Sequence, residues 1–170
     1  MLRRWLNTPH VYEWWGCHVG PGALGGAGKD AATETQVEAK YGPIIDHGSA
    51  THRFIIEHAG APIGLIQWYH LRDFAGYARA ISEDPAGTAG IDLLIGEPGA
   101  IGQGLGSRAI DAFVASVVFR SPDVDRVVAG PAATNARSLR VFAKAGFRRV
   151  RYASIEGELT PEAVMVHTRT

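Results

Sequence analysis

The sequence predicts an α/β (α+β) fold in which helices flank a mixed β-sheet, and three observations lead to this prediction. Residues 51–58 and 62–70 are rich in strand-forming residues, and Ala59-Gly60-Ala61 between them suits a hairpin turn. Residues 90–108 read as a buried strand, a glycine loop and the start of a helix. The segments that follow alternate between helix and strand patterns. A hairpin followed by such alternation implies a sheet with antiparallel and parallel parts.

The N-terminal part is predicted to be helical. Residues 1–15 form two helices divided at Thr8-Pro9, because Pro suits the first turn of a helix and Thr suits its cap. The six glycines of residues 16–32 predict a long loop, and residues 33–41 predict a further helix. An irregular connection is expected over residues 71–89. The remaining elements are a helix from Leu105, a strand at 126–129, a helix at 135–145, and strands at 147–154 and 163–168 with a turn at Gly157.

Composition excludes several classes of protein. The 170 residues suit a single domain, 1–170, with a real core. Lys plus Arg and Asp plus Glu each number 17, so nothing favours nucleic acid or a membrane surface as a partner. No apolar stretch approaches the ~18 residues of a membrane span. A lone cysteine, Cys17, and seven scattered histidines predict no metal site. Without a signal peptide, a cytoplasmic location is expected.

The glycine loop carries the first functional motif. Gly102, Gly104 and Gly106 leave backbone N–H groups uncovered where a helix begins, and such a terminus attracts phosphates. The dinucleotide fingerprint fails because its sixth place is Ser107, and the Lys of a Walker loop is absent. The loop resembles the pyrophosphate loop of GCN5-related N-acetyltransferases (GNAT), Arg/Gln-x-x-Gly-x-Gly/Ala. Gly104 and Gly106 fit this pattern, with Ile101 at its first place.

A second motif lies in residues 134–147, which resemble the other acetyl-CoA motif of the same family, Asn-x-x-(Ser/Ala)-x-x-x-(Tyr/Phe)-x-x-x-Gly-Phe. Asn135 either pairs with amide groups of the pantetheine arm or caps a helix. We favour simple core packing for the Phe142 side chain. The two motifs together imply a GNAT fold with acetyl-CoA as cofactor. The cofactor-binding residues they imply are Leu93, Leu94, Ile101, Gly102, Gln103, Gly104, Leu105, Gly106, Ser107, Asn135, Phe142 and Lys144.

A closer resemblance is to bacterial aminoglycoside 6′-N-acetyltransferases. It is carried by Trp5-Leu6-Asn7, Glu13-Trp14-Trp15-Gly16, Pro62-Ile63-Gly64, Asp84-Pro85, Gly90-Ile91-Asp92 and Lys144-Ala145-Gly146-Phe147. Siderophore-type lysine acyltransferases, a sister group, usually carry His at the place of Asp92. The resistance enzymes typically have Tyr at the place of Phe142, acidic and tryptophan residues near 78–82, and an Asp near Gly130, where this chain is largely neutral.

This resemblance implies acetyl transfer to the 6′-amine of an aminoglycoside by direct attack, which confers antibiotic resistance. Two alternatives remain open. The first is an enzyme that acylates another small amine, such as a siderophore precursor or a polyamine. The second is a non-catalytic acyl-CoA-binding module, which is considered because Phe142 stands where the resistance enzymes typically have Tyr.

Asp92 is the candidate general base, because it is an isolated carboxylate in an apolar strand beside the glycine loop. Burial would raise its pKa and a cationic substrate would lower it again, whereas a strand-edge Asp would only form a salt bridge. A backbone N–H of Leu93 or Leu94 is expected to stabilise the oxyanion. The substrate-binding candidates are Trp14 and Trp15, which could instead be core, and Tyr77, Glu83, Asp84 and Asp92.

The start of the chain predicts an exposed sheet edge. Acetyltransferases of this family usually open with a strand before the segment that corresponds to Trp5-Leu6-Asn7, and here Met1 lies only a few residues ahead of it. Residues 51–58 are therefore expected at an edge with unpaired backbone groups. Self-pairing in a homodimer, or the loop at 16–32, would cover this edge. The alternative is a longer natural protein.

Overall fold

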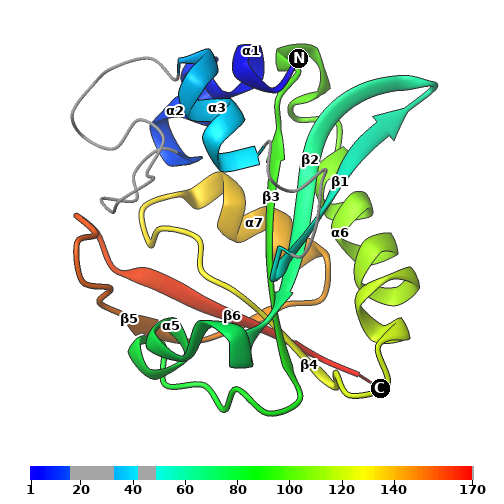
Figure 1. The fold of residues 1–170 in the computed structure, drawn as a ribbon. Coiled ribbons are helices and arrows are strands. Elements are labelled where there is room, and N and C mark those ends of the chain that lie inside the picture. Colours follow the sequence, from blue (N-terminus) through cyan, green and yellow to red (C-terminus); the bar gives the residue numbers. More distant parts are fainter. Residues whose placement is uncertain (16–32, 42–48, 170) are drawn as a thin grey trace.

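The computed structural model describes residues 1–15, 33–41 and 49–169. Figure 1 shows a central twisted sheet with the N-terminal helices at one end. The helices are α1 (Leu2–Leu6), α2 (Pro9–Trp15), α3 (Glu34–Tyr41), α5 (Ala75–Ala80), α6 (Leu105–Ser116) and α7 (Ala136–Lys144), with short 3-10 helices η1 (Leu71–Phe74), η2 (Pro98–Ala100) and η3 (Val118–Arg120). The strands are β1 (Thr51–His58), β2 (Ala61–His70), β3 (Thr88–Ile95), β4 (Arg126–Ala129), β5 (Arg148–Ala153) and β6 (Glu162–Thr168).

The six strands form one sheet in the order β1-β2-β3-β4-β6-β5. Among the strand pairs of the described residues, only β3–β4 is parallel, and α6 makes the crossover between these two strands. The predicted mixed sheet is therefore confirmed. The β1–β2 hairpin turns at Ala59 and Gly60, whose φ angles of 50° and 76° are the left-handed pair that a tight two-residue turn requires.

Strands β3 and β4 separate along their length, which prepares the position of the site. They pair only from Thr88 to Gly90, whereas β3 continues to pair with β2 as far as Ile95. In Figure 1, β3 accordingly runs away from β4 and β6 toward the N-terminal helices. Beyond Gly90, the β4-facing side of β3 has no strand partner within the described residues. The backbone N–H and C=O groups on this side of β3 are therefore available to a ligand that binds between the strands.

Helix α6 packs one apolar face onto the sheet, as its sequence spacing predicts. Ile110, Phe113 and Val114 are buried in the main core with Ile66 and Ile91 of the sheet. The N-terminal helices form a second cluster around Trp5, which is fully buried. A Cβ on Gly96 would lie 2.0 Å from Trp5 Cγ, so a glycine is needed for this contact at the end of β3.

The segment from 71 to 89 is more regular than the sequence predicts. It contains η1 and α5, and β3 begins at Thr88. Leu71, Ala78 and Ile81 bury their side chains against β4 and β6, so these short helices are stabilised by tertiary packing rather than by a long amphipathic pattern. The Thr8 hydroxyl, predicted to cap α2, donates a 2.6 Å hydrogen bond to the Trp5 carbonyl oxygen at the end of α1.

Strand β1 lies at the edge of the sheet, as predicted. Phe54 and Ile55 expose 41% and 42% of their surface there. The loop at 16–32, proposed to cover this edge, lies outside the described residues. Within the described ranges, no helix is long and apolar enough to cross a membrane.

Candidate active site

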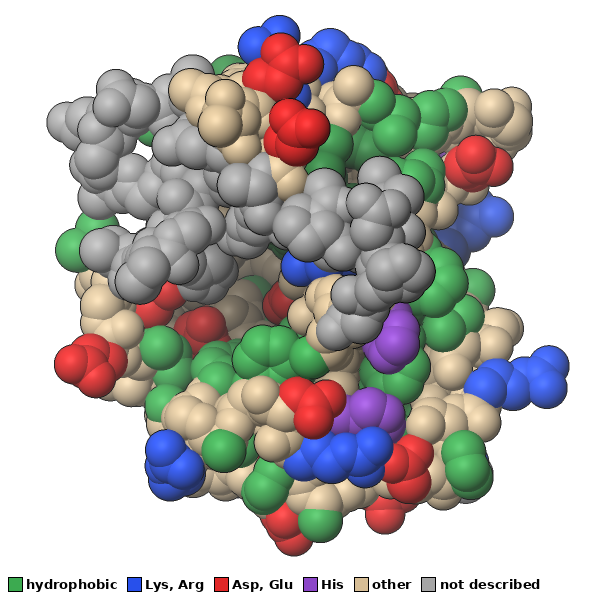
Figure 2. Space-filling model, viewed as in Figure 1, with side chains coloured by type: hydrophobic (Ala, Val, Ile, Leu, Met, Phe, Trp, Pro, Cys, Tyr) green, Lys and Arg blue, Asp and Glu red, His purple; other side chains and the backbone are tan. Residues whose placement is uncertain are grey.

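A cavity of about 650 Å³ opens where β3 separates from β4. Figure 2 shows a hollow on this face, with acidic side chains at its wall. The structure brings most of the sequence-predicted residues to this one cavity. Those that line it are Trp14, Trp15, Asp92, Leu93, Leu94, Ile101, Gly102, Gly104, Leu105, Gly106, Ser107, Asn135, Phe142 and Lys144.

One end of the cavity suits phosphate groups. Gly102 and Gly104 adopt φ angles of 81° and 74°, which L-residues with side chains rarely adopt, and this turns the loop tightly into α6. Gly104 is the N-cap of α6, and among the described residues no side chain caps the helix, so its first backbone N–H groups are available to an anion. Arg137, Arg140 and Lys144 line the same cavity from α7 and add positive charge.

Helices α6 and α7 approach closely beside this loop. A Cβ on Gly106 would lie 3.3 Å from Val141 Cγ1, so a larger residue would require Val141 to shift by a few tenths of an ångström. Asn135 caps α7, because its Oδ1 accepts a 3.0 Å hydrogen bond from the Ser138 backbone N–H. Its side-chain NH₂ group can donate at the same time. The helix-cap alternative for Asn135 is therefore observed, and a second contact with a bound amide stays a prediction.

A row of polar side chains crosses the other end of the cavity. Arg53, Gln67 and Asp92 face one another across β1, β2 and β3 in the strand register. Arg53 Nε donates to Gln67 Oε1 at 2.9 Å, and Gln67 Nε2 donates to Asp92 Oδ2 at 2.8 Å. Because guanidinium N–H groups only donate, Arg53 fixes which way the Gln67 amide points. The row thereby fixes the orientation of the half-buried Asp92 carboxylate, which lines the cavity.

Aromatic residues of the N-terminal helices cover this row. The Arg53 guanidinium lies 5.3 Å from the ring centre of Tyr41 in a cation–π contact. Trp15 Nε1 donates to the Tyr41 hydroxyl at 3.1 Å. Burial raises the pKa of Tyr41, which therefore keeps its proton and stays neutral. Tyr41, Arg53 and Gln67 all line the cavity, and sequence reasoning missed all three as site residues.

The start of β6 and the turn before it bring two further carboxylates to the cavity. Glu162, at the start of β6, is only 6% exposed and lines the cavity with Glu158 and Gly130. The Tyr77 hydroxyl donates a 2.7 Å hydrogen bond to Glu162 Oε2. Tyr77, predicted to bind substrate, therefore stands behind Glu162 and is not among the residues that line the cavity.

A model of the acetyltransferase (GNAT) domain matches residues 1–155. The chain belongs to the GNAT acetyltransferase family. It is 32% identical over 174 residues to the aminoglycoside N(6′)-acetyltransferases type 1 of Klebsiella pneumoniae and of Serratia marcescens. Each alignment covers 99% of this chain and 77% of the relative. This acetyltransferase is thus similar in sequence to aminoglycoside N(6′)-acetyltransferases over nearly its whole length.

Solved structures give the same result for the fold. The aminoglycoside acetyltransferase AAC(6′)-Ib in complex with ribostamycin and coenzyme A superposes with a TM-score of 0.73 at 28% identity. The match covers 99% of this chain and 87% of that one. An uncharacterised protein of Bacillus halodurans has a TM-score of 0.75 at 22% identity over 99% of this chain and 77% of its own, which supports the fold alone. The predicted GNAT fold is confirmed.

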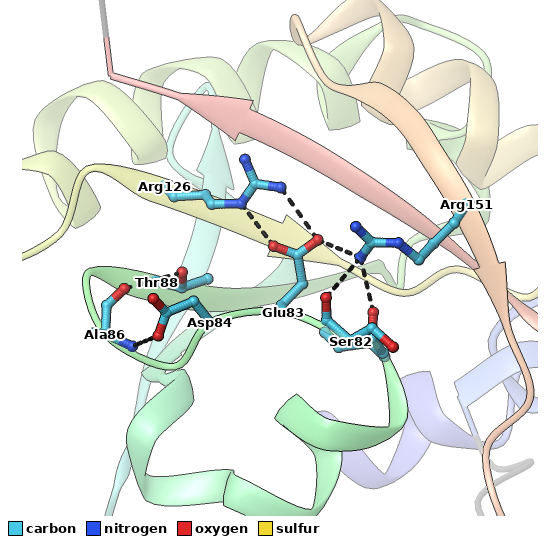
Figure 3. A network of polar contacts seen from close by, with 8 residues as sticks. Ser82, Glu83, Asp84, Ala86, Thr88, Arg126 and Arg151 are labelled. Carbon is cyan, nitrogen blue, oxygen red and sulfur yellow. Dashed lines mark hydrogen bonds and ion pairs between the residues drawn. The ribbon is translucent and has the colours of Figure 1, made fainter.

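Besides Tyr77, two more of the predicted substrate-binding residues of this acetyltransferase lie outside the cavity lining. Glu83 is buried away from the cavity lining, and Arg126 and Arg151 both bind its carboxylate (Figure 3). Its nearest contacts are 2.7 Å to Arg126 Nε and 2.5 Å to Arg151 Nη1. Asp84 is exposed, and its Oδ1 accepts from the Ala86 backbone N–H at 2.9 Å. These carboxylates hold the connection before β3, and the structure does not bring them to the cavity where substrate is expected.

Two further residues of the motifs have structural contacts. Gln103, predicted to bind cofactor, is exposed outside the cavity lining, and its Nε2 donates to the Gly99 carbonyl oxygen at 2.6 Å. Phe142 lines the cavity but is only 4% exposed, and its ring packs edge-on against Phe147 at 5.2 Å between centres. Within the described ranges, no group of three or more His, Cys, Asp and Glu side chains is arranged to hold a metal ion.

Proposed function

We propose that this acetyltransferase is one domain that transfers the acetyl group of acetyl-CoA to the 6′-amine of an aminoglycoside antibiotic and so confers resistance. The observation that carries the proposal is the cavity, around which the glycine loop, α7 and the Asp92 carboxylate meet. The names of the relatives support the acceptor, because the K. pneumoniae and S. marcescens proteins are aminoglycoside N(6′)-acetyltransferases. Acetyl-CoA and paromomycin occur together in a structure of AAC(6′)-Ib.

The phosphate end of the cavity fits the cofactor. Free N–H groups at the start of α6, reached through two glycines with positive φ, would hold its phosphates. Arg137, Arg140 and Lys144 would add charge-assisted contacts. The pantetheine arm would lie along β3 and contact Leu93, Leu94 and Asn135. When bound, acetyl-CoA supplies a thioester whose carbonyl carbon accepts a nucleophile.

Asp92 is assigned the role of general base. Alkyl amines are mostly protonated at neutral pH, since their pKa is near ~10, so each transfer needs a group that accepts a proton. The Asp92 carboxylate takes this proton, directly or through a water, as the N–C bond forms. A β3 backbone N–H, from Leu93 or Leu94, stabilises the oxyanion. The C–S bond then breaks with its electron pair on sulfur, and a thiol pKa of roughly 8.5 makes the thiolate a tolerable leaving group.

A specific observation favours one alternative, a module that binds acyl-CoA without turning it over. The Phe142 ring stands on α7 beside the cavity and carries no proton to give to a leaving thiolate. The row through Gln67 supports catalysis instead, because it orients a carboxylate that simple cofactor binding does not need.

Thiol release from acetyl-CoA distinguishes these functions. The assay uses kanamycin and ribostamycin, which carry a 6′-amine, and paromomycin, which has a hydroxyl group there. The proposal predicts thiol release with the first two and none with paromomycin. Equal release with all three would contradict the 6′ position. Tight acetyl-CoA binding without release in any of them would favour the binding module.

The homodimer also belongs to the proposal. Strand β1 is an edge of the sheet, and Phe54 and Ile55 are exposed on it, so pairing with β1 of a second copy would satisfy its outer backbone groups. Hydrogen exchange read together with sedimentation tests this. Protection of residues 51–58 that rises with protein concentration is expected, whereas exchange at the free-peptide rate would contradict a covered edge.

A further inference from the structure

Glu162 is a buried carboxylate that the fold fastens at the wall of the cavity. Residues 161–163 are bonded by their backbone to the segment that follows β4. The Ala163 N–H donates to the Pro131 carbonyl oxygen at 2.8 Å, and the Ala133 N–H donates to the Pro161 carbonyl oxygen at 2.8 Å. Glu162 thus starts β6 from a fixed backbone position, and only 6% of it is exposed. Burial of a carboxylate costs free energy, so a carboxylate held in a fixed buried position is a candidate for a functional role.

The Glu162 carboxylate fills the space above Gly130. A Cβ built on Gly130 would lie 2.0 Å from Glu162 Oε2 and 2.4 Å from the Tyr77 hydroxyl oxygen. The φ angle of Gly130 is not positive, so the glycine is needed here for space rather than for conformation. The negative charge beside the end of β4 therefore comes from a side chain of β6.

Tyr77 sets the direction of this carboxylate. Its hydroxyl donates to Glu162 Oε2, and burial together with the neighbouring Tyr69 and Glu162 raises the pKa of Tyr77 far above its usual range. Tyr77 is therefore a donor at every physiological pH. Burial, followed by the charges of Asp92 and Glu162, likewise raises the pKa of Tyr69.

Among the described residues that line the cavity, three are carboxylates: Asp92 on β3, Glu162 at the start of β6, and Glu158 in the turn before it. A base for a single reacting amine needs only one of them. We propose that Glu162 binds a second ammonium group of the acceptor, and that it selects polyamines over monoamines. This inference rests on the proposed acetyl transfer and names the charge pattern of its substrate. A charged hydrogen bond in a site of this kind is strong because little water competes with it.

Glu162→Gln is the first test, because a glutamine keeps the size of the side chain and can still accept from Tyr77. Kanamycin is titrated calorimetrically into the enzyme with coenzyme A present, and thiol release gives the KM values. The expected result is a rise of about 10- to 100-fold in the Kd and KM for kanamycin. The KM for acetyl-CoA and the kcat/KM for cyclohexylmethylamine, a monoamine, should not change. Glu156→Gln, an exposed carboxylate two residues before Glu158, is the matched control.

A relocation variant separates binding from a structural role. Gly130→Ala should displace the Glu162 carboxylate and weaken kanamycin binding as Glu162→Gln does, and the two changes together should be no worse than either alone. Gly130→Asp combined with Glu162→Ala returns a carboxylate to the same space from the neighbouring strand. It should recover most of the lost affinity for kanamycin. A residue that served only folding would give no such rescue.

Each outcome decides the inference. An unchanged Kd for kanamycin in Glu162→Gln would overturn it, and so would an equal loss for kanamycin and the monoamine. Kanamycin that binds to the wild-type enzyme without thiol release would refute the proposed function. The Kd values for kanamycin would still test whether Glu162 binds an ammonium group. If kanamycin does not bind, spermidine takes its place in both assays. Binding of neither amine would overturn the inference together with the aminoglycoside proposal.

Discussion

Gln67 Nε2 donates a 2.8 Å hydrogen bond to Asp92 Oδ2 from the adjacent strand of the sheet. The same amide accepts from Arg53 through its oxygen, so its orientation is fixed on both sides. An ionised carboxylate is favoured by such a donor, and its angle to the cavity is held by strands rather than by a loop. Asp92 therefore has the geometry that a general base in a rigid site requires.

Replacement of Asp92 by Asn should lower kcat by ~10²-fold or more, since an amide cannot accept the proton. The KM for acetyl-CoA should stay the same because Asp92 lies at the other end of the cavity from the glycine loop. Thiol release at saturating acetyl-CoA measures both. Asp73→Asn, an exposed carboxylate in η1, is the control. Unchanged turnover in Asp92→Asn would place the base on another residue.

Loss of the Gln67 donor should slow the reaction without weakening the binding of acetyl-CoA. Gln67→Leu removes one hydrogen bond to a charged group, so kcat should fall about 3- to 10-fold. The acid limb of the kcat/KM profile should move to higher pH, because this hydrogen bond favours the ionised form of Asp92. The pH profile is the decisive readout. A fall in kcat with no shift of the acid limb would show that Gln67 only supports packing.

The motifs and Asp92 could be predicted from the sequence because each is a local pattern. The spacing of Gly104 and Gly106, and one carboxylate in an apolar strand, need no knowledge of distant contacts. The row through Arg53 and Gln67 depends on the register of three strands, which no single segment specifies. Glu162 was missed for a similar reason. The Glu162 carboxylate fills the space above Gly130 from another strand. The glycine at position 130 therefore predicts a neutral cavity wall, although this wall carries a carboxylate.

Glu83→Gln should destabilise the fold and leave the chemistry intact. The Glu83 side chain is only 3% exposed and binds two arginines that are partly exposed. Removal of its charge should therefore cost about 2 kcal/mol of unfolding free energy, between the values for exposed and buried pairs. Urea unfolding gives this value, and the kcat and KM for kanamycin should equal those of the wild type. A rise in KM for the amine would restore Glu83 as a substrate-binding residue.

The contribution of Glu83 should disappear in acid. Burial by itself raises the pKa of this carboxyl group, but hydrogen bonds and charge from Arg126 and Arg151 outweigh burial and hold it below its usual value. A lowered pKa in the folded state means that this stabilisation is fully present above about pH 4.5, the ordinary value, and is lost as the pH falls further. The urea midpoints of wild type and Glu83→Gln should therefore converge below pH 4. A constant difference from pH 7 to pH 3 would contradict this linkage.

Phe142→Tyr should add the proton donor that the cavity wall lacks at this position. Phe142 lines the cavity and is otherwise buried against Phe147, so the hydroxyl would reach the cavity or stay buried at a cost. If it reaches the cavity, kcat should rise by ~10²-fold, at the low end of what a general acid contributes. Single-turnover thiol release isolates this step. A lower melting temperature with unchanged kcat would show that the ring is only core.

The acetylated product tests the central claim most directly. Kanamycin is incubated with acetyl-CoA and the wild-type enzyme, and the product is analysed by mass spectrometry and by NMR of the amine-bearing carbons. The account predicts a single added acetyl group, located on the 6′ nitrogen, and almost no product with Asp92→Asn in the same time. An acetyl group on another nitrogen, or no acetylated kanamycin from an enzyme that binds acetyl-CoA, would contradict it.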